Sequence, residues 1–165
     1  MQTPVTFRPA TPDDIPQILV FIRLLAEYEK LGDEVTATEA LLHEWLFEKH
    51  KAEVVFAEVD HEAVGFALFF YNFSTFLGRA GLYLEDLYIK EAHRGKGYGK
   101  AILKELARLA VARGCGRLEW SCLDWNRPSI DLYLSLGARP MDEWTVYRLT
   151  GDALLHMASD QSGHI

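Results

Sequence analysis

The glycine-rich segment Arg94-Gly95-Lys96-Gly97-Tyr98-Gly99 is the part of the sequence best suited to bind a charged ligand. It directly follows an expected strand and opens an expected amphipathic helix. Glycines can point several bare backbone N–H groups at one spot, and the helix dipole adds positive potential there. This arrangement suits a pyrophosphate group, the alternative being a merely structural tight turn before a helix.

Two well-known phosphate loops do not fit this segment. A P-loop needs a Gly five residues before its Gly-Lys pair and Ser or Thr after it, but Arg94 and Ala101 occupy those positions. The dinucleotide fingerprint GxGxxG also fails, because Gly95, Gly97 and Gly99 have the spacing GxGxG. The segment therefore indicates a different kind of anion site.

Two adjacent acids interrupt the apolar stretch before this segment. Glu85 and Asp86 lie between Leu82-Tyr83-Leu84 and Leu87-Tyr88-Ile89. Because alternate residues of a strand face opposite ways, at least one carboxylate must point toward covered surface. We expect Glu85 to bind a substrate ammonium and to accept its proton, directly or through water; a structural ion pair is the alternative.

A third acid falls on the apolar stripe of the first helix. Ile15, Ile18, Ile22 and Leu25 recur at helical spacing, and the next position of that stripe is Glu29. A carboxylate where a core residue is expected points to a pocket, whereas a solvated helix end is the ordinary alternative.

The rest of the chain predicts alternating helices and strands. Helices are expected from Thr11, from Thr38, over 101–113 and over 128–136, and the turn Asp60-His61-Glu62 marks a hairpin. Strands are expected at 5–8, 54–59, 63–71, 82–89, 118–122 and 144–149. The expected fold class is α/β (α+β), with a mixed, partly antiparallel central sheet flanked by helices in a single domain. That domain is expected over 1–158, followed by a frayed polar tail over 159–165.

Composition narrows the partners. The formal net charge of −7 disfavours nucleic acid and anionic membranes and favours cations. The longest apolar run, 63–71, is too short to span a membrane, and the N-terminus does not resemble a secretory signal, so we expect a cytoplasmic protein. Cys115 and Cys122 lack CxxC spacing and the histidines are scattered, which predicts reduced thiols and no metal.

The residues Arg94, Gly97 and Gly99 form Arg-x-x-Gly-x-Gly, which resembles the acetyl-CoA-binding motif of the GNAT superfamily of N-acetyltransferases. Further segments resemble its diamine acetyltransferase branch, whose members modify polyamines or thialysine. These segments are Arg8-Pro9-Ala10-Thr11, Leu25-Ala26-Glu27-Tyr28-Glu29, Leu84-Glu85-Asp86, Trp125-Asn126-Arg127-Pro128-Ser129-Ile130 and Tyr133 ahead of Gly137. The resemblance implies a GNAT fold and, as an expectation, a homodimer.

The resemblance also implies a site for acetyl-CoA as cosubstrate. Backbone groups of Leu87, Tyr88 and Ile89 are expected to pair with the pantetheine arm at a splayed strand. The segment from Gly95 to Lys100 is expected to hold the pyrophosphate. Charge from Arg94, Lys96 and Lys100 is expected there too, although the two lysines could instead be a solvated helix start. The remaining expected contacts are Tyr98, Asn126, Ser129 and Tyr133, with Asn126 as either a cofactor ligand or a helix cap.

The implied reaction is direct transfer of acetyl to a primary amine in a ternary complex. Tyr28, Glu29 and Glu85 would bind the small cationic amine, such as a polyamine, diamine or lysine analogue, and Glu85 would take its proton. Tyr133 would protonate the departing CoA thiolate, whereas by pattern alone it is a packed core tyrosine.

Two rival functions remain open at this stage. One is a sensor or interaction module that binds acetyl-CoA without catalysis. The other is an acetyltransferase that acts on protein amines.

Overall fold

The computed structural model describes residues 4–160, which form two compact units that divide between Leu123 and Asp124. The first unit holds five strands: β1 Thr6–Pro9, β2 Glu53–Val59, β3 Glu62–Ser74, β4 Arg79–Ile89 and β5 Leu118–Trp120. Its helices are α1 Ile15–Tyr28, α2 Glu39–Leu42 and α3 Tyr98–Ala112, with 3-10 turns at Pro12–Asp14, Gly32–Glu34 and Glu91–His93 and a π-helix at His43–Glu48. The second unit holds α4 Arg127–Ser135 and α5 Gly151–Ser159. Most of the predicted tail lies outside the described residues.

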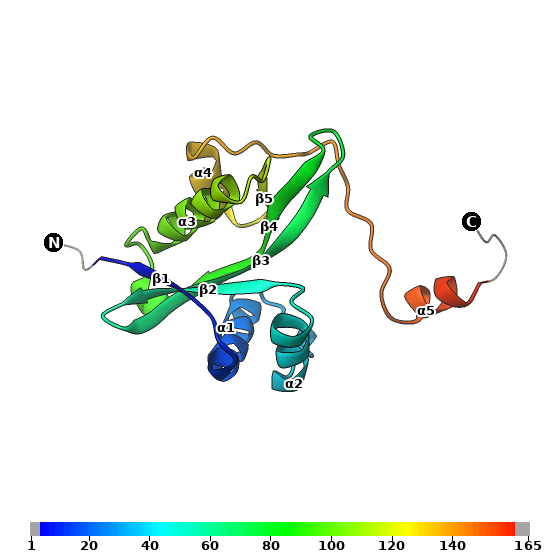
Figure 1. The fold of residues 1–165 in the computed structure, drawn as a ribbon, viewed down its shortest axis with the longest axis horizontal. Helices are drawn as coiled ribbons and strands as arrows, with labels where there is room; N and C mark the ends of the chain where they lie inside the picture. The colour runs from blue at the N-terminus through cyan, green and yellow to red at the C-terminus, as the bar shows by residue number, and fades with distance from the viewer. Residues whose placement is uncertain (1–3, 161–165) are drawn as a thin grey trace. The chain divides into compact units, whose positions relative to one another are not determined.

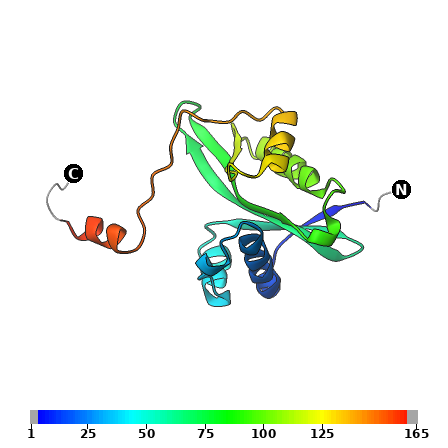
Figure 2. The same ribbon diagram turned by 180° about the vertical axis from the view of Figure 1, so that it is seen from behind.

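The strands form one mixed sheet in the order β1-β2-β3-β4-β5. The first three pairings are antiparallel, and β4 pairs with β5 in parallel. In the first unit, α1 and α2 cover one face of the sheet and α3 covers the other (Figure 1), as the reverse view also shows (Figure 2). The predicted fold class, a mixed and partly antiparallel sheet flanked by helices, is confirmed.

The predicted hairpin turn and the helix starts at Thr11 and Thr38 are confirmed, whereas α3 begins at Tyr98, three residues before the predicted start. Asp60 and His61 have φ angles of 51° and 63°, the left-handed values that a two-residue hairpin loop needs. At the first helix the Asp14 carboxylate accepts the Thr11 backbone N–H at 2.7 Å and two bonds from Arg8, which lowers the Asp14 pKa. At the second helix, Thr38 Oγ1 accepts the Leu41 N–H at 3.2 Å.

The second predicted helix differs from expectation in its buried face. The apolar positions expected after Thr38 are Leu41, Leu42, Trp45 and Leu46; Leu42 and Leu46 are buried, but Leu41 and Trp45 are exposed. The helix turns into a π-helix from His43, and the wider turn departs from α-helical spacing at Trp45.

The predicted strand over 144–149 is wrong, because the described chain has no regular element there and instead forms α5 at Gly151–Ser159. Aromatic and β-branched residues favour a strand only where a neighbouring strand accepts its backbone hydrogen bonds. No described strand pairs with this segment. Its side chains Trp144, Val146 and Tyr147 are exposed.

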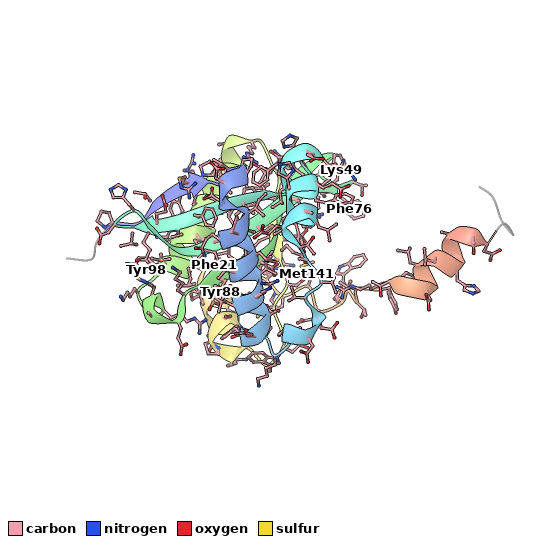
Figure 3. All side chains as sticks on the ribbon, turned by 90° about the horizontal axis from the view of Figure 1, so that it is seen from below. Phe21, Lys49, Phe76, Tyr88, Tyr98 and Met141 are labelled. Atoms are coloured by element: carbon pink, nitrogen blue, oxygen red, sulfur yellow. The ribbon has the colours of Figure 1, made fainter. Side chains whose placement is uncertain are left out.

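Phe21 anchors α1 to the sheet. Its ring stacks on Phe66 of β3 with centroids 5.3 Å apart, and it lies 6.0 Å from the ring of Tyr88 of β4. Figure 3 shows Phe21 and Tyr88 beside each other along α1. All three side chains belong to the same buried cluster, so this contact holds α1 against the middle of the sheet.

We expect Phe21→Ala to lower the free energy of unfolding by about 3–5 kcal/mol, because Phe21 is fully buried and the cavity cannot be filled from outside. Urea unfolding measures this loss. The control is Val20→Ala on the same helix, where the side chain is 47% exposed and the change should stay within about 0.5 kcal/mol. Equal effects of the two substitutions would contradict the packing of α1 described above.

Candidate active site

The glycine-rich loop connects the end of β4 with the start of α3. Gly95 and Gly97 have φ angles of 77° and 85°, which only glycine adopts without strain. A Cβ at either position would meet nothing within 4 Å, so the loop backbone borders open space. Left-handed residues interspersed in a turn in this way form a concave set of N–H groups that suits an anion.

The start of α3 adds further donors to this loop. The first hydrogen bond within α3 runs from the Ala101 N–H to the Gly97 carbonyl at 3.0 Å. The N-cap residue is Gly97, and no side-chain hydrogen bond caps this end of the helix. The N–H groups of Tyr98, Gly99 and Lys100 precede that bond, so they have no acceptor within the helix. Lys96 and Lys100 are exposed, whereas Tyr98 is buried. The loop therefore fits the diphosphate of a coenzyme.

The edge of β4 next to β5 is open beyond Leu84. Pairing with β5 covers only Leu82 to Leu84, because β5 has three residues. The pairing with β3 shifts at the same place: Phe69 opposes Leu84 and Leu68 opposes Asp86, which leaves Glu85 as the extra residue of a β-bulge. From Glu85 onward, β4 pairs only with β3 among the described strands.

The register shows which backbone groups this open edge presents. The Lys90 N–H donates to the Val64 carbonyl at 2.9 Å, and hydrogen-bonded pairs alternate with non-bonded pairs in an antiparallel ladder. Tyr88 therefore turns its backbone groups toward β3, while Leu87 and Ile89 turn theirs away from it. Of the three expected main-chain contacts, Leu87 and Ile89 have the orientation that an added ligand needs.

Three carboxylates gather beside the bulge. Asp86 opposes Leu68 on the sheet face that carries Tyr88 and packs against α1. Burial, with added repulsion from Glu85 and Glu29, raises the pKa of Asp86 to about 6. Burial and then Glu85 also raise the pKa of Glu29. The structure thus brings together the two predicted acids and adds Asp86 as the most deeply placed of the three.

Sequence reasoning missed Asp86 because it could only state that one of the two adjacent acids is covered. The bulge decides which one, and a bulge depends on the pairing of two strands rather than on local sequence. Glu85 is exposed, which suits a group that must meet a substrate, and Asp86 is half-buried.

Arg94 lies at the junction of the loop and the acid cluster. Its guanidinium carbon is 4.8 Å from the centroid of the Tyr28 ring and 5.3 Å from that of Tyr88. Its Nε donates to the Ile89 carbonyl at 3.0 Å. The predicted substrate residue Tyr28 and the predicted cofactor residue Arg94 are therefore in direct contact.

The remaining predicted residues belong to the second unit. Asn126 is the N-cap of α4, but its side chain makes no capping bond, and its Oδ1 is buried without a hydrogen-bond partner. The helix-cap alternative for that side chain is therefore wrong. Ser129 and Tyr133 are half-buried on α4, so Tyr133 is not a fully packed core residue.

Within the described part of the chain, no group of three or more His, Cys, Asp or Glu side chains could hold a metal ion. Over the same residues, none of the helices has the length and apolar character needed to cross a membrane.

A sequence model described as "Acetyltransferase (GNAT) family" matches residues 20–138. The chain belongs to this family. The match includes the loop, the open edge of β4, the acid cluster and Tyr133. Because GNAT enzymes use acetyl-CoA as cosubstrate, the prediction of an acetyl-CoA-dependent N-acetyltransferase is confirmed.

Named relatives and solved structures agree with this membership. Thialysine N-epsilon-acetyltransferase of Bos taurus is 38% identical and covers 93% of this chain and 97% of its own length. L-ornithine N5-acetyltransferase NATA1 of Arabidopsis thaliana is 34% identical, and the match covers 89% of this chain and 85% of that protein. An integron cassette protein of V. cholerae superposes with a TM-score of 0.79 at 28% identity. The superposition covers 94% of this chain and 98% of that protein.

We expect the Asp86→Asn variant of this GNAT enzyme to be more stable than the wild type at pH 7 by up to about 3 kcal/mol, since the folded pKa of about 6 exceeds the ordinary 3.8. The advantage should shrink as the pH falls through 6 toward 4, because the wild-type folded state then takes up a proton. Urea unfolding at several pH values measures this.

The matched control variant should change the stability at pH 7 in the opposite direction. Asp14 has a lowered pKa, because Arg8 stabilises its charge. Asp14→Asn should therefore destabilise the protein at pH 7, and that loss should fade at acid pH. An Asp86→Asn variant that behaves like Asp14→Asn would show that Asp86 is stabilised as an anion.

Proposed function

We propose that this GNAT enzyme transfers acetyl from acetyl-CoA to the primary amine of a small cationic substrate, such as a polyamine, diamine or lysine analogue. The observation that carries this proposal is the cluster of Glu29, Glu85 and Asp86 beside the open edge of β4. Two of these carboxylates have pKa values raised by burial and mutual repulsion, and a bound ammonium would relieve both effects. The names of the relatives, which include thialysine, L-ornithine and spermidine/spermine acetyltransferases, support the same substrate class.

The coenzyme has a matching set of backbone donors. The N–H groups from Gly95 to Lys100 would hold its diphosphate, and the outward-facing backbone of Leu87 and Ile89 would hold its pantetheine arm. The segment that holds Asn126 and Ser129 resembles the diamine acetyltransferase branch, and this resemblance implies that both residues would also contact the coenzyme. When bound, acetyl-CoA supplies the acetyl group as a thioester.

The acids would both bind the amine and prepare it. A primary amine with a pKa of about 10 is mostly protonated at pH 7 and must lose a proton before it can attack. Glu85 is the most exposed of the three carboxylates and would accept that proton, directly or through a water molecule. Glu29 and Tyr28, at the end of α1, would line the same pocket.

Tyr133 would donate its phenolic proton to the departing thiolate. The support for this role is the resemblance of the segment from Asn126 to Tyr133 to the diamine acetyltransferase branch, together with the half-buried position of the side chain. A phenol can supply a proton near neutral pH and recover it from solvent.

The domain limits 1–158, the homodimer and the cytoplasmic location stay predictions. The exposed side chains of Trp144, Val146 and Tyr147 support a subunit contact in the second unit, since a soluble monomer rarely exposes several large apolar residues together.

We expect Gly97→Ala to weaken acetyl-CoA binding at least about tenfold, because alanine costs about 1–2 kcal/mol in the left-handed region and moves the N–H groups of the loop. Isothermal titration calorimetry measures the affinity. Gly114→Ala is the control: its φ of 74° and open surroundings match those of Gly97, but it lies at the far end of α3. If the wild type binds no coenzyme, or if both variants bind normally, the proposed cradle is incorrect.

We expect Tyr133→Phe to lower kcat by about 10²–10⁴-fold while the affinity for acetyl-CoA stays within about twofold, because only the proton donor is removed. Release of free CoA with a panel of diamines, lysine analogues and peptides measures the rate, and also separates small amines from protein acceptors. Tyr147→Phe, at an exposed tyrosine of the same unit, is the control. Normal turnover with lost coenzyme affinity would refute the assignment.

A further inference from the structure

Arg94 touches three elements at once. It stands directly before Gly95 at the start of the loop, its Nε bonds the carbonyl of Ile89 at the end of β4, and its guanidinium lies over Tyr28 at the end of α1. Tyr88 forms the second aromatic surface under the same guanidinium. The first residue of the coenzyme loop is thereby joined to the wall of the amine pocket.

The chemistry of these contacts requires a guanidinium rather than a simple positive charge. A planar guanidinium can cover aromatic rings while its Nε–H donates in its own plane, whereas an ammonium is a point charge that cannot do both. The Ile89 carbonyl belongs to the open edge of β4, so Arg94 also occupies one acceptor at the end of that edge.

We propose that Arg94 is a positioning residue of the amine site, which holds Tyr28 and the adjoining Glu29 in place relative to the coenzyme loop. This inference rests on the proposed function and deepens it.

A phosphate ligand at position 94 makes a different prediction. Loss of a phosphate contact would weaken acetyl-CoA itself, and the defect would disappear with a donor that lacks the diphosphate. Loss of a positioning contact would weaken the amine with either donor. The two roles are therefore separated by the donor used and by the substrate whose KM changes.

The test compares Arg94→Lys with the wild type, using spermidine or L-ornithine as acceptor and acetyl-CoA or acetyl-pantetheine as donor. We expect the KM for the amine to rise about tenfold with both donors, since the variant loses both the planar contact with the rings and the bond to the Ile89 carbonyl, while calorimetry shows the affinity for CoA within about threefold.

Arg113→Lys is the matched control. Arg113 also lies over two aromatic rings, those of Phe69 and Tyr71, but it follows the C-terminal end of α3. The Arg113→Lys substitution should leave the KM for the amine unchanged. In a Tyr28→Leu background, Arg94→Lys should add no further increase in that KM, because the contact is already lost.

The outcomes separate this inference from the proposed function. A wild type that acetylates no amine overturns both. An active wild type whose Arg94→Lys variant has an unchanged KM for the amine overturns the inference alone. A defect confined to the KM for acetyl-CoA and absent with acetyl-pantetheine also overturns it, and assigns Arg94 to the phosphates.

Discussion

The extra residue at Glu85 is the constraint on which the site depends. Before it, Leu82 and Leu84 lie in register with β5; after it, the same edge is presented by Leu87 and Ile89 without a paired strand. The inserted residue lies where the pairing with β5 ends, and it reverses which side chains face α1. The open backbone edge and the acid cluster therefore begin at the same residue of β4.

The acid cluster is maintained against an electrostatic penalty. Asp86 would titrate near its ordinary pKa in water, and burial beside two further carboxylates raises that pKa to about 6. The contact of Phe21 with Phe66 and Tyr88 holds α1 and β4 together, so the carboxylates cannot separate without opening the core. A site that is strained when empty and relieved by a cation discriminates by charge.

The sequence allowed prediction of those features that depend on local chemistry. The glycine loop, the turn at Asp60 and the helix starts follow from which residues tolerate particular backbone angles or cap a helix, and the structure has them. To predict that Asp86 is the covered acid, one needs the register of β3 against β4. The strand wrongly predicted at 144–149 would have needed a neighbouring strand to pair with. The contact of Arg94 with Tyr28 joins residues far apart in the chain, and no local pattern encodes it.

Opposite charges are separated within the first unit. The N–H groups at the start of α3 and the exposed Lys96 and Lys100 favour an anion, while Glu29, Glu85 and Asp86 favour a cation. Under the proposed function each site would repel the ligand of the other, so an anionic coenzyme and a cationic amine would not exchange places. Since β4 runs from the acids to the loop, a single strand sets the distance between the two ligands. The geometry of transfer then depends on how rigidly the end of that strand is held.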